Sequence, residues 1–134
     1  MTMKIFGENL LAEFVFWNAR RQEIASRYLN EVSNSAITMQ VQPDTTKSVF
    51  HLFVVKVENR DKFIAYLNDN GINPGLHYPV ACHLQNAYKH LGYKEGSLPN
   101  AEKLAAQCVS LPMYAELTDE SVQKVIDALN AYEG

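Results

Sequence analysis

The chain has 134 residues, of which 47% are hydrophobic and 20% charged, and its formal net charge is −3 at pH 7. These values fit one globular domain with a single core, and they exclude the basic surface that nucleic-acid binding requires. No apolar run approaches the ~20 residues of a membrane span, and two cysteines are too few for a disulfide framework, which predicts a reducing, cytoplasmic setting.

The first half of the chain predicts a helix followed by two strands. The helix runs from Glu8 to about Val32, with an apolar stripe at Phe14, Trp17, Ile24, Tyr28 and Val32. A short strand within residues 36–44 ends at Pro43 and Asp44. Residues 48–59 (SVFHLFVVKVEN) form the clearest strand. Its nearly continuous apolar character predicts that both of its faces are covered.

The second half predicts three helices and two short extended segments. Asn59 caps a helix that stops at Gly71, and a short strand over residues 72–78 follows. Pro99 suits the first turn of the next helix. That helix has an apolar stripe at Ala101, Leu104, Ala105 and Cys108. Residues 110–114 look extended, and Thr118 caps a last helix with a stripe at Val122, Val125, Ile126 and Leu129.

This order of elements predicts an α+β fold, with a small and mostly antiparallel sheet and helices packed on it. Few and short strands leave a face or an edge of the sheet without cover. We therefore expect either a partner chain or a further domain to pack against it. Apolar residues of the first helix, Phe14, Phe16 and Trp17, are the expected contact, so the sequence predicts self-association through this helix.

The segment GINPGLHYPVACHLQNAYKHLGY, residues 71–93, has no core periodicity and concentrates histidine and tyrosine. Its polar tips on apolar bodies are typical of a ligand-facing loop, but a loop folded over the sheet with locally bonded hydroxyls explains them equally well. His51 is predicted to be a core or sheet histidine, and His90 an exposed one. A zinc site at His77, Cys82 and His83 has little support, because the adjacent Cys82 and His83 cannot easily reach one ion and no second ligand pair accompanies them. A Cys–His nucleophile has little support, because nothing around Cys82 indicates an activated thiol.

Several motifs, in order and spacing, resemble a known family: FHLF, GINPGLHYPVACHLQNAY, LGY, and AEKLAAQCVSLPMYAELTD. The chain from about Trp17 to Leu129 resembles the carboxyl-terminal part of DegT/StrS-type nucleotide-sugar aminotransferases. These are fold-type-I, pyridoxal-phosphate-dependent enzymes of sugar and antibiotic biosynthesis. The resemblance implies the small domain of such an enzyme for residues 17–134, with residues 1–16 an atypical, helical N-terminal segment.

The resemblance also implies the site. His77, Tyr78 and His83 correspond to residues that approach the sugar nucleotide, with His83 nearest the substrate. The Schiff-base lysine, the acid at the pyridine nitrogen and the phosphate ligands of the family have no matching position in this sequence. We therefore expect no cofactor and no metal bound by this chain alone, and no catalytic residue within it. Two functions follow: a domain competent only within a larger aminotransferase, or a free-standing binding or interaction module.

Overall fold

The computed structural model describes the backbone of residues 2–134 and the side chains of residues 11 and 13–134. The elements in chain order are α1 (Thr2–Glu31), β1 (Phe53–Lys56), α2 (Arg60–Asp69), the 3₁₀ helices η1 (Cys82–Leu84) and η2 (Asn86–Leu91), α3 (Pro99–Gln107), β2 (Cys108–Leu111) and α4 (Asp119–Ala131). The predicted α+β fold with an antiparallel sheet is confirmed: β1 pairs with β2, Phe53 opposite Leu111 and Lys56 opposite Cys108.

Local capping explains where the helices begin and end. The Asn59 side chain accepts a hydrogen bond from the Lys62 backbone N–H at 3.1 Å, and Thr118 does the same for Ser121 at 3.2 Å. Gly71 follows α2 with a φ of 67°, a left-handed conformation that glycine adopts without strain. These three predicted helix boundaries are confirmed.

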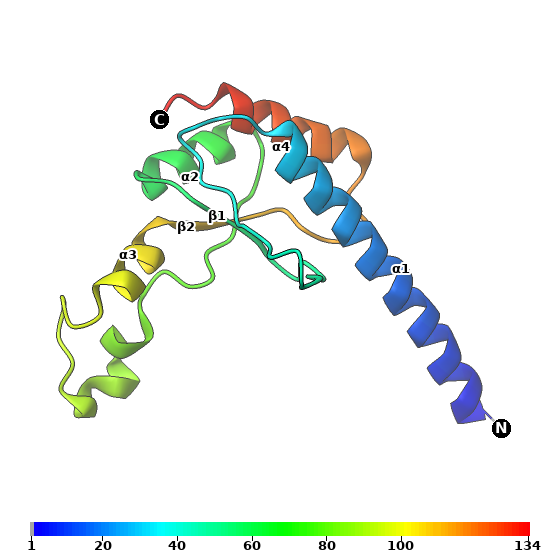
Figure 1. Cartoon of the computed structure of the whole chain (residues 1–134), viewed down its shortest axis with the longest axis horizontal. Coiled ribbons are helices and arrows are strands. Elements are labelled where there is room, and N and C mark those ends of the chain that lie inside the picture. The colour runs from blue at the N-terminus through cyan, green and yellow to red at the C-terminus, as the bar shows by residue number, and fades with distance from the viewer. Residues whose placement is uncertain (1) are drawn as a thin grey trace.

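The core lies on one face of the sheet, beneath α2, α4 and the C-terminal half of α1 (Figure 1). Phe53 stands at its centre, with the Tyr28 ring edge-on at 5.1 Å and the Phe50 ring stacked at 5.9 Å. Tyr28 donates a hydrogen bond to the Pro112 carbonyl at 3.0 Å, and burial raises the pKa of its phenol. Aromatic packing therefore ties α1 to β1. The predicted stripe of α4 is buried in the same core, at Val122, Val125, Ile126 and Leu129.

The strand predicted over residues 48–59 is shorter than expected, because the extended backbone begins only at Phe53. Phe50 has a φ of 46°, a left-handed conformation that interrupts an extended chain. The burial of its ring against Phe53 offsets the cost of that conformation. The prediction for His51 is wrong: it lies on a bend before β1 and is exposed, instead of being a core or sheet histidine.

The segments predicted as outer strands each make only one bridge to the sheet. Thr38 exchanges two backbone hydrogen bonds with Lys56, at 2.8 and 3.0 Å, and Gly75 exchanges two with Ser110, both at 2.8 Å. The strands expected over residues 36–44 and 72–78 are thus reduced to single residues. A bridge of one residue leaves the neighbouring peptide groups free, so these edges of the sheet can carry irregular loops.

Cys108 was expected on the apolar stripe of a helix, but α3 ends at Gln107 and Cys108 begins β2. Its backbone is extended, with φ −74° and ψ 137°, because it pairs with Lys56 across the sheet. Cys108 is nevertheless buried, as predicted for a packing residue. Helix α3 buries none of its own residues, so it lies at the margin of the core.

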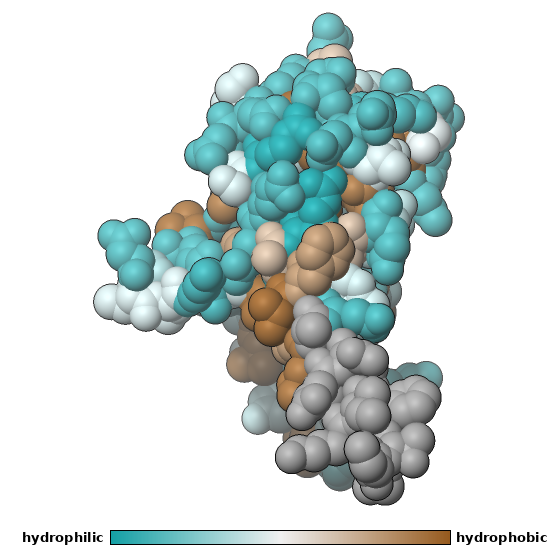
Figure 2. Space-filling model, turned by 90° about the vertical axis from the view of Figure 1, so that its right-hand side faces the viewer, coloured by the Kyte–Doolittle hydropathy of each residue, from teal (hydrophilic) through white to brown (hydrophobic). Residues whose placement is uncertain are grey.

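The second face of the sheet is covered only in part by the described part of the chain, since Cys108 and Ser110 of β2 are buried there while β1 is open. Val54 is half-buried and Lys56 is exposed on β1, so the prediction that both faces of this strand are covered is wrong for this chain. The N-terminal half of α1 also projects away from the core (Figure 1). Its exposed apolar residues are Leu11, Phe14, Val15 and Phe16, of which Leu11, Phe14 and Val15 share one side of the helix. Figure 2 shows apolar surface on this part of the helix. No described helix has the length and apolar character needed to cross a membrane.

Candidate functional site

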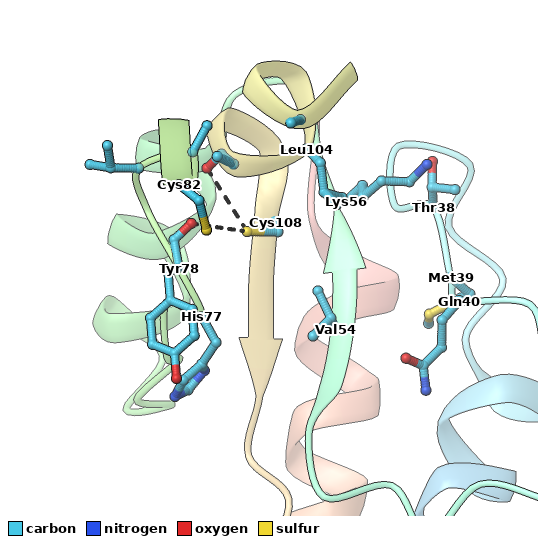
Figure 3. A pocket seen from close by; sticks show the side chains of 14 residues that line it. Thr38, Met39, Gln40, Val54, Lys56, His77, Tyr78, Cys82, Leu104 and Cys108 are labelled. Carbon is cyan, nitrogen blue, oxygen red and sulfur yellow. Dashed lines mark hydrogen bonds between the residues drawn. The ribbon is translucent and has the colours of Figure 1, made fainter. Parts of the chain in front are cut away.

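The open face of the sheet forms the floor of a groove of about 540 Å³. Val54 and Lys56 from β1 and Cys108 from β2 supply this floor, because alternate residues of a strand point to the same face. Figure 3 shows the loop residues His77 and Tyr78 on one side of it, and residues 38–40 on the other. Ala101, Leu104 and Ala105 of α3 close one end. The predicted apolar stripe of α3 therefore faces the groove instead of the core.

His77 lies on the groove wall and is tied to β2. Its ring atom Nδ1 is 2.9 Å from the hydroxyl oxygen of Ser110, a hydrogen-bond distance. Ser110 is 4% exposed, whereas His77 is exposed on its outer side. The histidine is thus anchored at one nitrogen and accessible at the rest of its ring.

Tyr78 is also exposed at the groove wall, with 71% of its surface accessible. Its ring packs edge-on against that of His77 at 5.6 Å. The backbone carbonyl of Tyr78 accepts a contact from the Cys108 thiol at 3.9 Å, which joins the loop to β2 a second time. The backbone is therefore held while the phenol is presented to solvent at the edge of the groove.

His83 is placed differently from His77 and Tyr78, because its side chain does not line the groove. It is 7% exposed, and its Nε2 lies 2.8 Å from Oε1 of Glu102, with the Tyr93 ring edge-on at 6.0 Å. The structure thus brings His77 and Tyr78 together at the groove and turns His83 toward α3. In this arrangement His83 fastens η1 to the first turn of α3.

Glu102 is a residue that the sequence analysis did not single out. Its carboxylate accepts hydrogen bonds from the backbone N–H groups of Gly96 at 2.8 Å and Leu98 at 3.1 Å, besides its contact with His83. These N–H groups, and His83 to a smaller degree, hold the pKa of the Glu102 carboxyl below its usual value. The sequence feature that could have indicated this role is an acidic residue in the first turn of a predicted helix, where a carboxylate can accept hydrogen bonds from backbone N–H groups that have no partner in the helix.

Ser110 was missed as well. Its signal was a single hydroxyl within a buried apolar strand, where a polar side chain needs a hydrogen-bond partner. Cys82 and Cys108 both line the groove as free thiols. Among the residues that the structure describes, no three histidine, cysteine, aspartate or glutamate side chains gather as metal ligands would.

The groove residues do not fit pyridoxal phosphate. A protein that binds this cofactor supplies a lysine for the Schiff base and a charged partner for the pyridine nitrogen. Lys56 supplies one ammonium group, but no described residue of the groove lining is an aspartate, glutamate or arginine. The start of α3 does not serve the phosphate either, because the Glu102 carboxylate already takes the N–H group of its cap residue, Leu98.

Together, the fold and the site define a small α+β domain that presents a histidine–tyrosine loop beside an uncovered sheet face. The chain belongs to the DegT/DnrJ/EryC1/StrS aminotransferase family, whose model matches residues 6–130. It is 39% identical over 123 residues to the dTDP-3-amino-3,4,6-trideoxy-α-D-glucose transaminase of Streptomyces venezuelae, covering 91% of this chain and 32% of that protein.

Solved structures agree with this relationship. DesV of S. venezuelae, in complex with a ketimine intermediate, matches 90% of this chain with a TM-score of 0.86 and 40% identity, over 33% of its own length. Spr1654 of Streptococcus pneumoniae, in its PLP-form, matches 90% of this chain with a TM-score of 0.79 and 29% identity, over 32% of its length. The chain therefore spans about a third of the length of the relatives it matches.

Proposed function

We propose that this chain acts as the substrate-facing small domain of a pyridoxal-phosphate-dependent nucleotide-sugar aminotransferase, in amino-sugar, polysaccharide or antibiotic-sugar biosynthesis. The observation that carries the proposal is the match to DesV, at 40% identity and a TM-score of 0.86, a structure that contains a ketimine intermediate. The relative from S. venezuelae is named as a transaminase of a dTDP-amino sugar. A dTDP-linked keto sugar is accordingly the substrate class that we propose.

The loop supplies the substrate contacts in this proposal. His77 and Tyr78 stand at the edge of the groove. The His77 ring and the Tyr78 carbonyl each contact β2, and both residues are exposed. We retain His83 as a proposed substrate-side residue, which acts through the loop that its contact with Glu102 fastens. None of the three is proposed to carry out the transfer of the amino group.

The cofactor is proposed to be bound by a region that corresponds to the remaining two thirds of the relatives. Pyridoxal phosphate supplies the electron sink of transamination when it is bound. This chain contributes a wall that orients the sugar nucleotide and excludes water from it. We accordingly expect no transamination from this chain alone, a proposal that the groove chemistry supports because its lining offers no partner for the pyridine nitrogen.

The uncovered surfaces follow from the same proposal. The groove lining is apolar apart from Lys56 and a few other polar groups, most of the described exposed residues in the N-terminal half of α1 are apolar, and burial of apolar surface by a partner is favourable. We propose that the rest of the aminotransferase covers the groove. The exposed apolar residues of α1, which are Leu11, Phe14, Val15 and Phe16, are proposed to contact a second copy of the chain, in keeping with the self-association predicted from sequence.

A chimaeric enzyme tests the proposed function. The C-terminal third of the S. venezuelae relative is replaced by this chain, and transamination of its dTDP-sugar substrate is measured. We expect an active chimaera in which Tyr78→Phe loses about threefold to tenfold in kcat/KM, the effect of one hydrogen bond to substrate. Tyr88→Phe is the matched control, because Tyr88 is an exposed tyrosine of η2 outside the groove. A folded chimaera without turnover would contradict the proposal.

The isolated chain provides a second test. We expect that pyridoxal phosphate added to it forms no stoichiometric, borohydride-reducible lysine adduct. A one-to-one adduct accompanied by turnover of a dTDP-keto sugar would show that the chain binds the cofactor itself. The proposal that a different region binds the cofactor would then be wrong.

The alternative function is that of a free-standing binding or interaction module. The groove supports this alternative, because its volume of about 540 Å³ and its mostly apolar lining suit a ligand or peptide without any transamination chemistry. Genomic context separates the two functions. A neighbouring reading frame that encodes the other two thirds of the family sequence favours the aminotransferase, and a gene standing alone favours the module.

A further inference from the structure

The position of the His77 imidazole depends on two residues that have no assigned role. Ser110 lies beneath it on β2, with its hydroxyl oxygen 2.9 Å from Nδ1. Gly75 precedes it in the loop and exchanges two backbone hydrogen bonds of 2.8 Å with Ser110. Gly75, His77 and Ser110 therefore form one unit, in which the backbone bridge sets the position from which the ring reaches β2.

The absence of a side chain at position 75 is what admits the ring. A Cβ atom at Gly75 would stand 2.8 Å from Cε1 of His77 and 3.3 Å from Nδ1. The first distance is shorter than any ordinary carbon–carbon contact, so an alanine would push the imidazole off its position. The backbone of Gly75 is not in the left-handed region, so the requirement for glycine at this position comes from space and not from φ.

The direction of the Ser110–His77 hydrogen bond follows from the needs of the hydroxyl. A hydroxyl group carries one proton to donate, and a buried donor without an acceptor costs free energy. For the 4% exposed Ser110, the only side-chain partner among the described residues is Nδ1 of His77. If Nδ1 carried the proton, the Ser110 hydroxyl would have no acceptor. Ser110 therefore donates to Nδ1, and the proton of the neutral ring resides on Nε2.

We propose that Ser110 and Gly75 are positioning residues, which hold His77 as its Nε2–H tautomer so that this N–H donates a hydrogen bond to an oxygen atom of the substrate. Nε2 makes no hydrogen bond to any residue that the structure describes, and His77 lines the groove. An N–H donor selects a carbonyl, hydroxyl or phosphate oxygen and rejects another donor. The identity of that ligand rests on the proposed function, whereas the tautomer rests on the geometry of this chain alone.

Nuclear magnetic resonance of the full chain tests the tautomer. Long-range ¹H–¹⁵N correlations of histidine-labelled protein are recorded at about pH 8, above the usual titration range of histidine. We expect the Nε2–H pattern for His77, and a mixture of both tautomers in Ser110→Ala. Ser110→Thr keeps the hydroxyl in a strand-favouring residue and is expected to restore the single tautomer. His90, exposed on η2, serves as the internal control in each spectrum.

Two results overturn the proposal. One is an Nδ1–H pattern for His77 in the unaltered chain, and the other is an unchanged His77 pattern in both Ser110→Ala and Gly75→Ala. If Ser110→Ala fails to fold, Gly75→Ala decides the matter, because it keeps the hydroxyl and moves only the ring.

The chimaeric enzyme supplies the functional measurement. Ser110→Ala is expected to raise KM for the dTDP-sugar about fivefold, with a smaller change in kcat, and Ser110→Thr to restore KM. An equal loss in both variants would mean that the strand position, and not the hydroxyl, matters. An inactive chimaera with the expected spectra would count against the proposed function and leave the positioning of His77 established.

Discussion

The two faces of the small sheet show what this chain completes by itself and what it leaves open. On one face, Phe53 and Val55 of β1 are fully buried beneath α1, α2 and α4. On the other face of the same strand, at the floor of the groove, Val54 is half-buried and Lys56 is exposed. One strand of four residues therefore has a finished core on one side and an accessible surface on the other.

The two sides also differ in the interactions that hold them. The covered side depends on apolar and aromatic packing, as in the contacts of Phe53 with Tyr28 and Phe50. The side of the groove depends on individual hydrogen bonds, such as His83 to Glu102 and His77 to Ser110. Packing stabilises the whole domain, whereas single hydrogen bonds position a loop. Substitutions on the covered side should therefore lower the free energy of unfolding of the whole domain, and substitutions on the groove side should have smaller, local effects.

The largest effect is expected from the covered face. Phe53→Ala removes a fully buried ring and should lower the free energy of unfolding by about 3–5 kcal/mol, a large part of the stability of a small domain. Val54→Ala, one residue further along on the open face, is the matched control and should cost about 1 kcal/mol or less. Urea denaturation followed by circular dichroism measures both. Equal losses would show that the open face is also packed in solution.

The exposed apolar residues of α1 test whether the uncovered surface has a partner. Phe14→Asp combined with Phe16→Asp places charges at side chains that are 54% and 67% exposed. Sedimentation should show that the unaltered chain associates and that the double variant dissociates at least tenfold more readily, because burying an unpaired charge opposes association. Unfolding free energy should change little. A monomeric unaltered chain at all concentrations would contradict self-association through α1.

A smaller and local effect is expected at Glu102, whose carboxylate binds the backbone before α3 and the side chain of His83. Glu102→Gln removes the charge that accepts the N–H groups of Gly96 and Leu98 and contacts His83. Amide exchange at Gly96 and Leu98 should rise about tenfold, because charge-assisted hydrogen bonds are the stronger ones, while core amides keep their protection. Glu95→Gln is the control within the same loop. A global loss of protection would mean that the loop and the core unfold as one unit.

The smallest effect concerns pH. The pKa of the Glu102 carboxyl is lowered by backbone hydrogen bonds, and that of Asp119 by its hydrogen bond and ion pair with Arg20. A carboxyl with a lowered pKa stabilises the fold above its unfolded value, near 4.5 for Glu102, and loses that contribution as the pH falls through the folded value. Stability should be flat near neutrality and decline below about pH 4.5. The difference between the unaltered chain and Glu102→Gln should narrow over the same interval, measured by urea titrations across pH.

Much of the fold was predictable because it depends on neighbours in the sequence. The caps at Asn59 and Thr118 and the glycine at position 71 act within one helical turn, and the apolar stripe of α4 follows from its own spacing. The composition of residues 71–93 indicated either a ligand-facing loop or a loop folded over the sheet, and it left the choice open. His77 and Tyr78 of this segment do stand at a groove, although their contact with substrate stays a prediction.

Other features could not be read from local sequence, because residues far apart decide them. Cys108 lies in β2 and not in α3, because it pairs with Lys56 across the sheet. His51 lies outside β1, because the left-handed backbone of Phe50 turns the chain and buries the Phe50 ring. His83 turns toward α3 because Glu102 lies 2.8 Å away after folding.

The sequence by itself determined the four α-helices, the helix ends at Asn59, Gly71 and Thr118, the core stripe of α4 and the family resemblance, since each of these depends on residue types and short spacings. Only the tertiary structure decided that one face of β1 stays open, that the stripe of α3 lines a groove, and that Ser110 lies within hydrogen-bond distance of the His77 ring. The physical reason is that a hydrogen bond or a packed face joins residues that the chain brings together only when it folds.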